Sequence, residues 1–187
     1  KKNGKISTLA LFPNVPTDAF GETIPMQAVP TGVVKGPDGA LWYTEFGTDA
    51  APPALPSARV SRMTTGGTVT ALTKGMMYDA QPRYSPDGQW VLFTSDRDGG
   101  DNVWTIEVAT GKTKQITKGK SNRYRSPEWT PDGSYIIVSR APQPIGPSKP
   151  WMFHKDGGAG IQLVRDPAPL PNGAFPLSLV GAAFGKD

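Results

Sequence analysis

The tripeptide Pro-Asp-Gly occurs three times at similar spacing, and this repeat constrains the fold more than any other feature of the sequence. It stands at residues 37–39, 86–88 and 131–133, within GPDG, SPDG and TPDG. Proline sets φ at the second position of a type I turn, and glycine occupies the fourth position without steric cost. Each copy therefore predicts a tight turn between two antiparallel strands. The predicted turn residues are Pro37, Asp38, Gly39, Pro86, Asp87, Gly88, Pro131, Asp132 and Gly133.

Each turn is followed by a strand whose two faces are both apolar or aromatic. After the second turn the run WVLFTS places large apolar residues on both faces, and ALWYTEF and SYIIVSR have the same character. A strand that is apolar on both faces has to be covered on both faces. One sheet with a solvated side cannot provide that cover, whereas stacked sheets can. We therefore predict that residues 41–46, 90–95 and 135–139 lie in the middle of stacked sheets.

Each copy extends to a unit of four strands. In the second copy, a strand that ends at SPDG is followed by WVLFTS, by NVWTIEVA and, after a TGK turn, by KTKQITK. The alternating charges of that last segment suit an exposed outer edge. In the first copy the last two strands are predicted to meet at a hairpin over Gly66 and Gly67, and in the third at a hairpin over Gly157 and Gly158.

The spacing of the turns identifies the architecture. With the C-terminal FGKD counted as a fourth copy, the turn aspartates are 49, 45 and 55 residues apart: Asp38, Asp87, Asp132 and Asp187. Four strands in about 40–50 residues is the period of a β-propeller blade. We predict an all-β fold, a β-propeller segment with about three complete four-stranded blades and partial terminal strands. Its predicted parts are a partial outer strand and loop (1–30), three blades (31–75, 76–119 and 120–166) and the inner strand of a next blade (167–187).

The two ends of the chain predict incomplete blades. Strands at residues 6–12 and 177–183 would belong to blades whose other strands the chain does not contain. Three blades are too few to close a ring. We therefore expect either a homodimer that closes a ring from two copies or one part of a longer chain. Because the sequence starts with Lys-Lys-Asn, a processed, trimmed or recombinant piece is expected.

The composition limits the class of protein. Glycine (22) and proline (20) are abundant without a collagen-like period, as in folds with many tight turns. An apolar fraction of 37% indicates a folded chain. The absence of cysteine excludes disulfides, and no apolar run is long enough for a membrane-spanning helix. The net charge of +4 comes from scattered residues, so we expect neither a nucleic-acid partner nor membrane insertion.

The sequence contains no catalytic constellation. A single histidine, His154, cannot build a metal-hydrolase centre, and neither a G-x-S-x-G motif nor a cysteine nucleophile occurs. The segments TGG and DGG are interpreted as hairpins rather than phosphate loops, because no helix is predicted after them. We expect no catalytic residue and no cofactor.

One acidic segment, DRDGGDN at residues 96–102, has the composition of a calcium loop. Asp96, Asp98 and Asp101 could offer oxygen ligands. No bidentate glutamate stands at the twelfth position of such a loop, and no helices are predicted beside it. A polar turn is therefore the favoured interpretation, no metal is expected, and these three aspartates are kept as a weak calcium candidate.

Propeller geometry indicates where a ligand or partner would bind. With strands A to D counted outward from the channel, the A–B and C–D turns share one face, and the D–A and B–C loops surround the channel mouth. The candidate binding residues on the mouth face are Arg83, Asp96, Asp98, Asp101, Tyr124, Arg125, Arg140 and Trp151. Proline-rich loops at 47–58 and 141–151 are predicted there too. Such loops suit a protein or peptide partner, and they are also what long, stiffened connections look like.

Two family resemblances accompany these patterns. Residues 78–187 resemble the WD40-like (PD40, TolB-type) propeller repeats found N-terminal to a family of amidohydrolases, through YDAQPRYSPDGQWVLFTSDRDGGDNVWT, NRYRSPEWTPDGSYIIVSRA, WMFHKDGGAGIQL and GAAFGKD. Residues 5–75 resemble the ScyD/ScyE-type secreted propeller proteins, through ISTLALFPNV, IPMQAVPTGVVKGPDGALWYTEF and ARVSRMTTGGTVTAL. That family has a longer apolar loop where this chain has GTDAAPPALPSA. Because the two resemblances meet near Gly75, the chain is interpreted as a fragment, a natural mosaic or an engineered chimera.

The resemblances imply a secreted or periplasmic location and one of two functions. The first is a non-catalytic β-propeller module that binds a protein or peptide partner and forms part of a larger propeller or assembly. The second is the accessory propeller of a PD40-containing amidohydrolase whose catalytic domain is absent here. The amidohydrolase resemblance implies a metal centre built from several histidines, and this chain supplies one.

Overall fold

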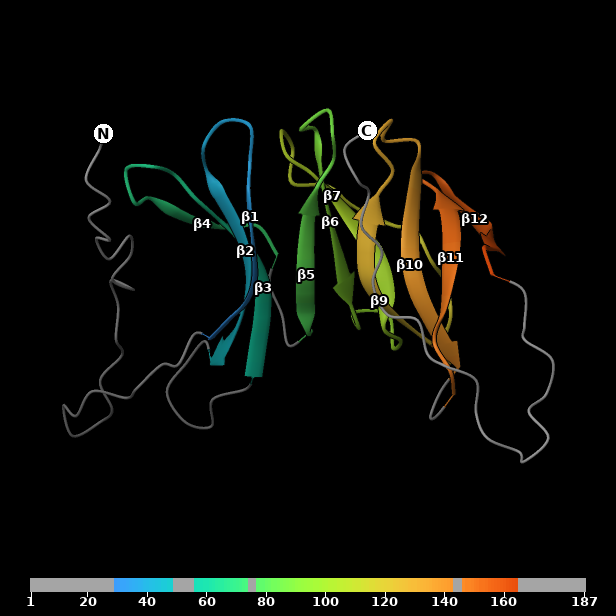
Figure 1. Cartoon of the computed structure of the whole chain (residues 1–187). Helices are drawn as coiled ribbons and strands as arrows, with labels where there is room; N and C mark the ends of the chain where they lie inside the picture. The colour runs from blue at the N-terminus through green and yellow to red at the C-terminus, as the bar shows by residue number, and fades with distance from the viewer. Residues whose placement is uncertain (1–28, 49–55, 74–76, 143–145, 165–187) are drawn as a thin grey trace, which may run out of the picture.

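Three four-stranded antiparallel sheets make up the described part of the protein, shown as a computed structural model in Figure 1. The structure describes residues 29–48, 56–73, 77–142 and 146–164. Blade 1 consists of β1 (Val29–Lys35), β2 (Leu41–Thr48), β3 (Pro56–Met63) and β4 (Val69–Ala71). Blade 2 consists of β5 (Asp79–Tyr84), β6 (Trp90–Ser95), β7 (Asn102–Glu107) and β8 (Thr113–Gln115). Blade 3 consists of β9 (Asn122–Trp129), β10 (Tyr135–Pro142), β11 (Lys149–His154) and β12 (Gly157–Gln162).

Each sheet follows the sequence order, so neighbouring strands in the chain are neighbours in the sheet. The three sheets stand side by side in Figure 1 in the order blade 1, blade 2, blade 3. Four-stranded meanders stacked in this way are propeller blades, and the predicted all-β propeller fold is confirmed. The strands predicted at residues 6–12 and 177–183 lie outside the described residues. No described element is a helix that could span a membrane.

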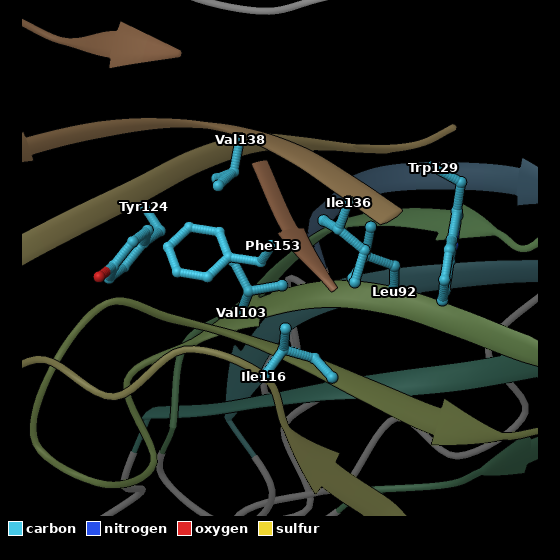
Figure 2. Close-up of a cluster of buried hydrophobic side chains, with 8 residues drawn as sticks. All are labelled: Leu92, Val103, Ile116, Tyr124, Trp129, Ile136, Val138 and Phe153. Atoms are coloured by element: carbon cyan, nitrogen blue, oxygen red, sulfur yellow. The ribbon is translucent and has the colours of Figure 1, made fainter. Parts of the chain in front are cut away.

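Blade 2 is buried on both faces, as its two-sided apolar pattern predicts. In β6, Leu92, Val91 and Phe93 are all fully buried. Leu92 belongs to the core between blades 2 and 3, which Figure 2 shows and which contains Leu92, Val103, Ile116, Tyr124, Trp129, Ile136, Val138 and Phe153. Val91 and Phe93 belong to the core between blades 1 and 2, which contains Ala40, Trp42, Val60, Val91, Phe93 and Ile106. Stacking therefore provides the hydrophobic burial that one sheet could not.

Blade 3 departs from the prediction that residues 135–139 are covered on both faces. Ile136 and Val138 are buried against blade 2, whereas Ile137 on the opposite face is only half-buried. The prediction is wrong for that face because no further blade among the described residues covers it.

The last hairpin of blade 3 also differs from the prediction. The turn is formed by Lys155 and Asp156, and β12 already begins at Gly157, which pairs with His154. Gly157 and Gly158 have φ values of 100° and 115° and begin the returning strand. The glycine pair therefore follows the turn, because a positive φ is needed at the irregular start of β12 rather than in the turn itself.

The Pro-Asp-Gly turns share one hydrogen-bonding pattern. In each turn the carboxylate Oδ1 of the aspartate accepts the backbone N–H two residues later, at 3.0 Å for Asp38, 3.0 Å for Asp87 and 3.1 Å for Asp132. The turn glycines have φ between 69° and 78°, a region that favours glycine. The carboxylate of the repeat therefore holds the start of the second strand of each blade.

The turns of adjacent blades also touch one another. A Cβ built on Gly88 would lie 2.7 Å from Cγ of Pro37, and one built on Gly133 would lie 3.5 Å from Cδ of Pro86. The proline of one turn thus packs on the glycine of the turn in the next blade. This contact gives the tripeptide a role between blades as well as within each blade.

Candidate functional site

The innermost strands of blades 2 and 3 carry a β-bulge at the same position. The pairing of β5 with β6 and that of β9 with β10 each contain a register shift. At these shifts Gln81 and Ser126 have positive φ values of 56° and 50°, and each directly precedes a proline. Proline cannot donate a hydrogen bond to a neighbouring strand, so within sheets it is confined to edges and bulges. The X-Pro pair therefore marks the bulge in both blades.

Two side chains join the bulged strands across the gap between the blades. The side-chain Oε1 of Gln81 accepts a hydrogen bond from the backbone N–H of Ser126 at 2.7 Å. Two residues further on, Nε of Arg83 donates to Oε2 of Glu128 at 2.9 Å. Arg83 is a predicted binding residue, and in the structure its guanidinium forms an ion pair that links β5 to β9.

A cleft of about 360 Å³ opens between blades 2 and 3 at the end where β6 finishes and β9 begins. It is lined by Tyr78, Ala80, Gln81, Thr94, Ser95, Asp96, Asp101, Tyr124 and Arg125. We call it the loop-face cleft, since the D–A and B–C connections lie at this end. Four predicted binding residues meet in it: Asp96, Asp101, Tyr124 and Arg125.

The loop-face cleft has a rigid aromatic wall. Tyr124 is 3% exposed, and its ring packs edge-on against Phe153 with centroids 5.9 Å apart. Burial raises the pKa of the Tyr124 hydroxyl, and the positive charge of Arg140 partly opposes this effect. Tyr124 is therefore held neutral and in place by the core, with its edge at the cleft.

Two opposite charges lie in the same cleft and are unpaired within the residues that the structure describes. Asp101 belongs to the turn after β6 and Arg125 to β9, so they come from adjacent blades. Within the described part of the chain, neither side chain forms a hydrogen bond or an ion pair with another residue. Asp96 differs, because its Oδ1 accepts the backbone N–H of Tyr78 at 2.7 Å. The cleft thus offers an unengaged carboxylate and an unengaged guanidinium.

A buried ion pair beside the cleft was not predicted. Nη2 of Arg97 lies 2.8 Å and 2.9 Å from the two carboxylate oxygens of Asp79, which is 1% exposed. Asp79 also accepts the hydroxyl of Thr73 at 2.7 Å. The Arg97 guanidinium lies 5.0 Å from the ring centroid of Phe93 and 5.1 Å from that of Trp104. The sequence feature that could have indicated this ion pair is Arg97, an arginine within an otherwise acidic turn.

The acidic turn does not gather its aspartates around a cation site. Asp98 accepts the amide Nδ2 of Asn102 at 3.0 Å and also the side-chain amide of Gln115. Asp96 is directed to strand β5 instead, through its bond to Tyr78. Among the described residues no group of three or more His, Cys, Asp or Glu side chains is placed to hold a metal ion. The calcium candidate therefore rests on composition alone.

Arg140 and Trp151 form a separate pair on blade 3. The guanidinium carbon of Arg140 lies 4.2 Å from the ring centroid of Trp151, within cation–π range. The pair lines a hollow of about 270 Å³ together with Pro142 and Pro147. The predicted site is thus divided. One group of its residues lies in the loop-face cleft, and Arg140 and Trp151 lie in a separate hollow. The side chains of Arg83 and Asp98 bind other residues of the protein.

A second cavity lies between blades 2 and 3 and was not predicted from the sequence. Its volume is about 340 Å³, and it lies at the end with the A–B and C–D turns. Its lining residues are Ser85, Asp87, Trp90, Thr105, Lys114, Trp129, Gly133, Lys155 and Asp156. We call it the turn-face cavity. The sequence feature that could have indicated this cavity is the position of Trp90 and Trp129 next to the Pro-Asp-Gly turns.

The single histidine lies outside both cavities. His154 ends β11 and is exposed, and its Nδ1 accepts the backbone N–H of Asp156 at 3.2 Å. Its ring meets Tyr135 edge-on at 5.4 Å between centroids. These contacts belong to the turn of blade 3.

Comparison with known proteins bears on the type of propeller. Residues 60–147 match the PD40 family, described as the TolB beta propeller domain. The Tol-Pal system protein TolB of Francisella tularensis subsp. mediasiatica is 38% identical over 60 residues, which are 32% of this chain and 14% of that protein. An uncharacterised protein of Agrobacterium fabrum is 29% identical over 152 residues, covering 73% of this chain and 46% of that one.

Solved structures agree on the fold. A putative TolB from Agrobacterium tumefaciens aligns with a TM-score of 0.60 and 23% identity, over 74% of this chain and 50% of that one. The β-propeller domain of the Trilobed protease from Pyrococcus furiosus aligns with a TM-score of 0.54 and 17% identity, over 74% and 43%. The chain therefore spans half or less of the relatives it matches.

The fold and the comparisons together define the class, which is a segment of a β-propeller. More particularly, residues 60–147 match the PD40, TolB type of repeat, and the resemblance predicted from the motifs of residues 78–187 is confirmed. The resemblance of residues 5–75 to ScyD/ScyE-type proteins stays a prediction.

Proposed function

We propose that this chain is a non-catalytic binding module, and that a protein or peptide partner binds in the loop-face cleft. The observation that carries the proposal is that Asp101 and Arg125, from adjacent blades, both line one cleft and form no ion pair or side-chain hydrogen bond among the described residues. Opposite charges on two adjacent blades provide electrostatic complementarity, which sets the partner and its orientation.

The surroundings of this pair suit a peptide. The edge of the Tyr124 ring lines the cleft and is held rigid by the core, and aromatic side chains are enriched in the centres of protein interfaces. The side-chain amide of Gln81 adds a donor that can match an acceptor of a peptide backbone, since its Oε1 already accepts from Ser126. The positions of Gln81 and Tyr124 are set by the bulge contact and the core, so little ordering is required on binding.

The proposal extends to the setting of the module. The segments 31–75, 76–119 and 120–166 would be consecutive blades of a larger propeller or assembly, either within a longer chain or in a homodimer. A secreted or periplasmic location is proposed from the family resemblances. The similar TolB proteins carry the name of a Tol-Pal system, which supports a role in contact with another protein.

A peptide selection tests the proposal. Random peptides displayed on phage are selected on the purified chain, and the affinity of the recovered peptides is measured by calorimetry. Arg125→Gln and Asp101→Asn are each expected to weaken binding by about tenfold or more, as for charged residues at the centre of an interface.

The matched control is Lys112→Gln, an exposed residue in the C–D turn of blade 2 at the opposite end. It removes one positive charge, as Arg125→Gln does, and is expected to leave the affinity unchanged. Peptides that bind equally well to Arg125→Gln and Asp101→Asn would contradict the proposal.

A further inference from the structure

The turn-face cavity is enclosed by contacts on two sides. Toward the channel, Pro86 packs on Gly133, where a built Cβ would come within 3.5 Å of the proline ring. Toward the outside, Nζ of Lys114 pairs with Oδ1 of Asp156 at 2.5 Å and bridges blades 2 and 3. The hollow between these contacts has a volume of about 340 Å³, at the lower end of the range for small-molecule sites.

The cavity combines aromatic rings with a carboxylate oxygen and an ammonium group that are unbonded among the described residues. Trp90 and Trp129 contribute indole rings from the two blades. Asp87 uses Oδ1 to accept Ser85 Oγ at 2.6 Å and the N–H of Gln89 at 3.0 Å, and its Oδ2 forms no hydrogen bond to any described residue. The Lys155 ammonium likewise has no partner in the described ranges, and its charge acts on Asp87.

The corresponding site between blades 1 and 2 is built differently. There the second oxygen of the turn aspartate, Oδ2 of Asp38, is bonded to the guanidinium of Arg62. The position of Trp90 is occupied by Leu41, and that of Trp129 by Tyr84, whose ring packs edge-on against Trp42 with 5.6 Å between centroids. An open carboxylate oxygen beside two indoles is therefore specific to the junction of blades 2 and 3.

The charges of the cavity exclude most ligand classes. Asp87 and Asp156 balance Lys114 and Lys155, so neither an anion nor a cation gains net attraction. A purely apolar ligand would leave the carboxylate oxygen and the ammonium desolvated without a bond. The site suits a neutral molecule that has an apolar face for the indoles and hydroxyl groups that both donate and accept.

We propose that the turn-face cavity binds a neutral saccharide of one or two rings. The C–H face of a pyranose ring would lie against the indole of Trp90, which is only partly buried, whereas Trp129 is 5% exposed and backs the cavity from the core. One hydroxyl of the sugar donates to Oδ2 of Asp87, and another accepts from Nζ of Lys155, both being charge-assisted bonds. This site lies at the opposite end from the loop-face cleft and is independent of the partner proposed there.

Tryptophan fluorescence and calorimetry test the proposal with defined probes. The full chain is titrated with maltose, cellobiose and N,N′-diacetylchitobiose as neutral sugars, and with galacturonic acid and glucosamine as charged ones. At least one neutral disaccharide is expected to bind, and Asp87→Asn is expected to weaken it about tenfold, because its amide donates where the carboxylate accepted. Trp90→Ala is expected to weaken it by a similar factor.

Asp132→Asn is the matched control. Asp132 makes the same turn bonds in blade 3, to Ser134 N–H at 3.1 Å and Thr130 Oγ1 at 2.5 Å, and does not line the cavity. It should leave sugar affinity unchanged, which separates the loss of a ligand contact from a weakened turn, and thermal unfolding shows whether each variant is folded. Binding of the charged sugars alone, no binding of any neutral probe, or equal affinities for Asp87→Asn and wild type would each overturn the proposal.

Discussion

At the scale of single residues, the turn aspartates connect stability to pH. The hydrogen bond from Ser85 and the N–H of Gln89 hold the pKa of Asp87 below its usual 3.8, and the pKa values of Asp38 and Asp132 are lowered as well. A carboxyl with a lowered pKa in the folded state contributes stability above its unfolded pKa, and this contribution is lost as the pH falls through the folded pKa. We expect a steady melting temperature from pH 7 to 5 and a decline below about pH 4. Asp87→Asn, whose amide does not titrate, should show a smaller decline in thermal scans at pH 7 and 3, and equal declines would contradict this assignment.

The turn glycines allow a second test at the same scale. Gly88 and Gly111 both have φ of 71°, but a Cβ on Gly88 would meet Pro37 at 2.7 Å, whereas nothing lies within 4 Å of one on Gly111. Gly111→Ala is expected to cost about 1–2 kcal/mol for the left-handed backbone alone. Gly88→Ala should cost about 1–3 kcal/mol more, because it also overpacks the contact between blades. Chemical denaturation measures both, and equal costs would mean that the proline contact contributes nothing.

At the scale of the strand, burial depends on whether a further blade covers the sheet. Leu92 in β6 and Ile137 in β10 occupy the same position of their blades, yet Leu92 is fully buried and Ile137 half-buried. Leu92→Ala is expected to destabilise by about 2–5 kcal/mol, the cost of a core cavity. Ile137→Ala should cost less than half of that, since part of its surface is already in water. Equal losses of stability in urea would contradict the exposed outer face of blade 3.

The strands could be predicted because they depend on short stretches of the sequence. The candidate sites could be predicted only in part, because they depend on contacts between blades. The turns and the two-sided run from Trp90 to Ser95 are visible in the sequence, and the topology places the ends of all strands on one of two faces. Asp101 and Arg125 could therefore be predicted to lie on the same face. It could not show that Arg83 is used by Glu128, because this depends on the distance between two side chains of different blades. The turn-face cavity was missed for a related reason, since it requires a turn aspartate with a free oxygen, a property of tertiary contacts.

At the scale of the whole molecule, an apolar row on the outer face of blade 3 is only partly covered by the described residues. Ile137 pairs with Met152, which pairs with Ile161, so their side chains lie in a row across the outer face of blade 3. Ile161 is 61% exposed, and Leu163 and Val164 beyond it are each 44% exposed. Figure 1 shows β12 at the far end of the stack, with no described strand beyond it. In blade 2 the equivalent face is covered by blade 3, so this face has the character of a surface that another sheet covers.

We therefore expect the isolated chain to associate through this face. A homodimer is the expected assembly, because two copies that meet through the same face leave it covered in both. Multi-angle light scattering at about 100 µM should give twice the mass of the chain, since an exposed apolar face of this kind drives association. Replacing Ile161 and Leu163 together by glutamate places charges in the contact and should restore the monomer mass. Lys112→Gln at the distant C–D turn of blade 2 is the control and should leave the dimer intact. A wild-type chain that stays monomeric at this concentration would show that this face is not used for self-association, and a dimer that survives the double glutamate change would place the contact elsewhere.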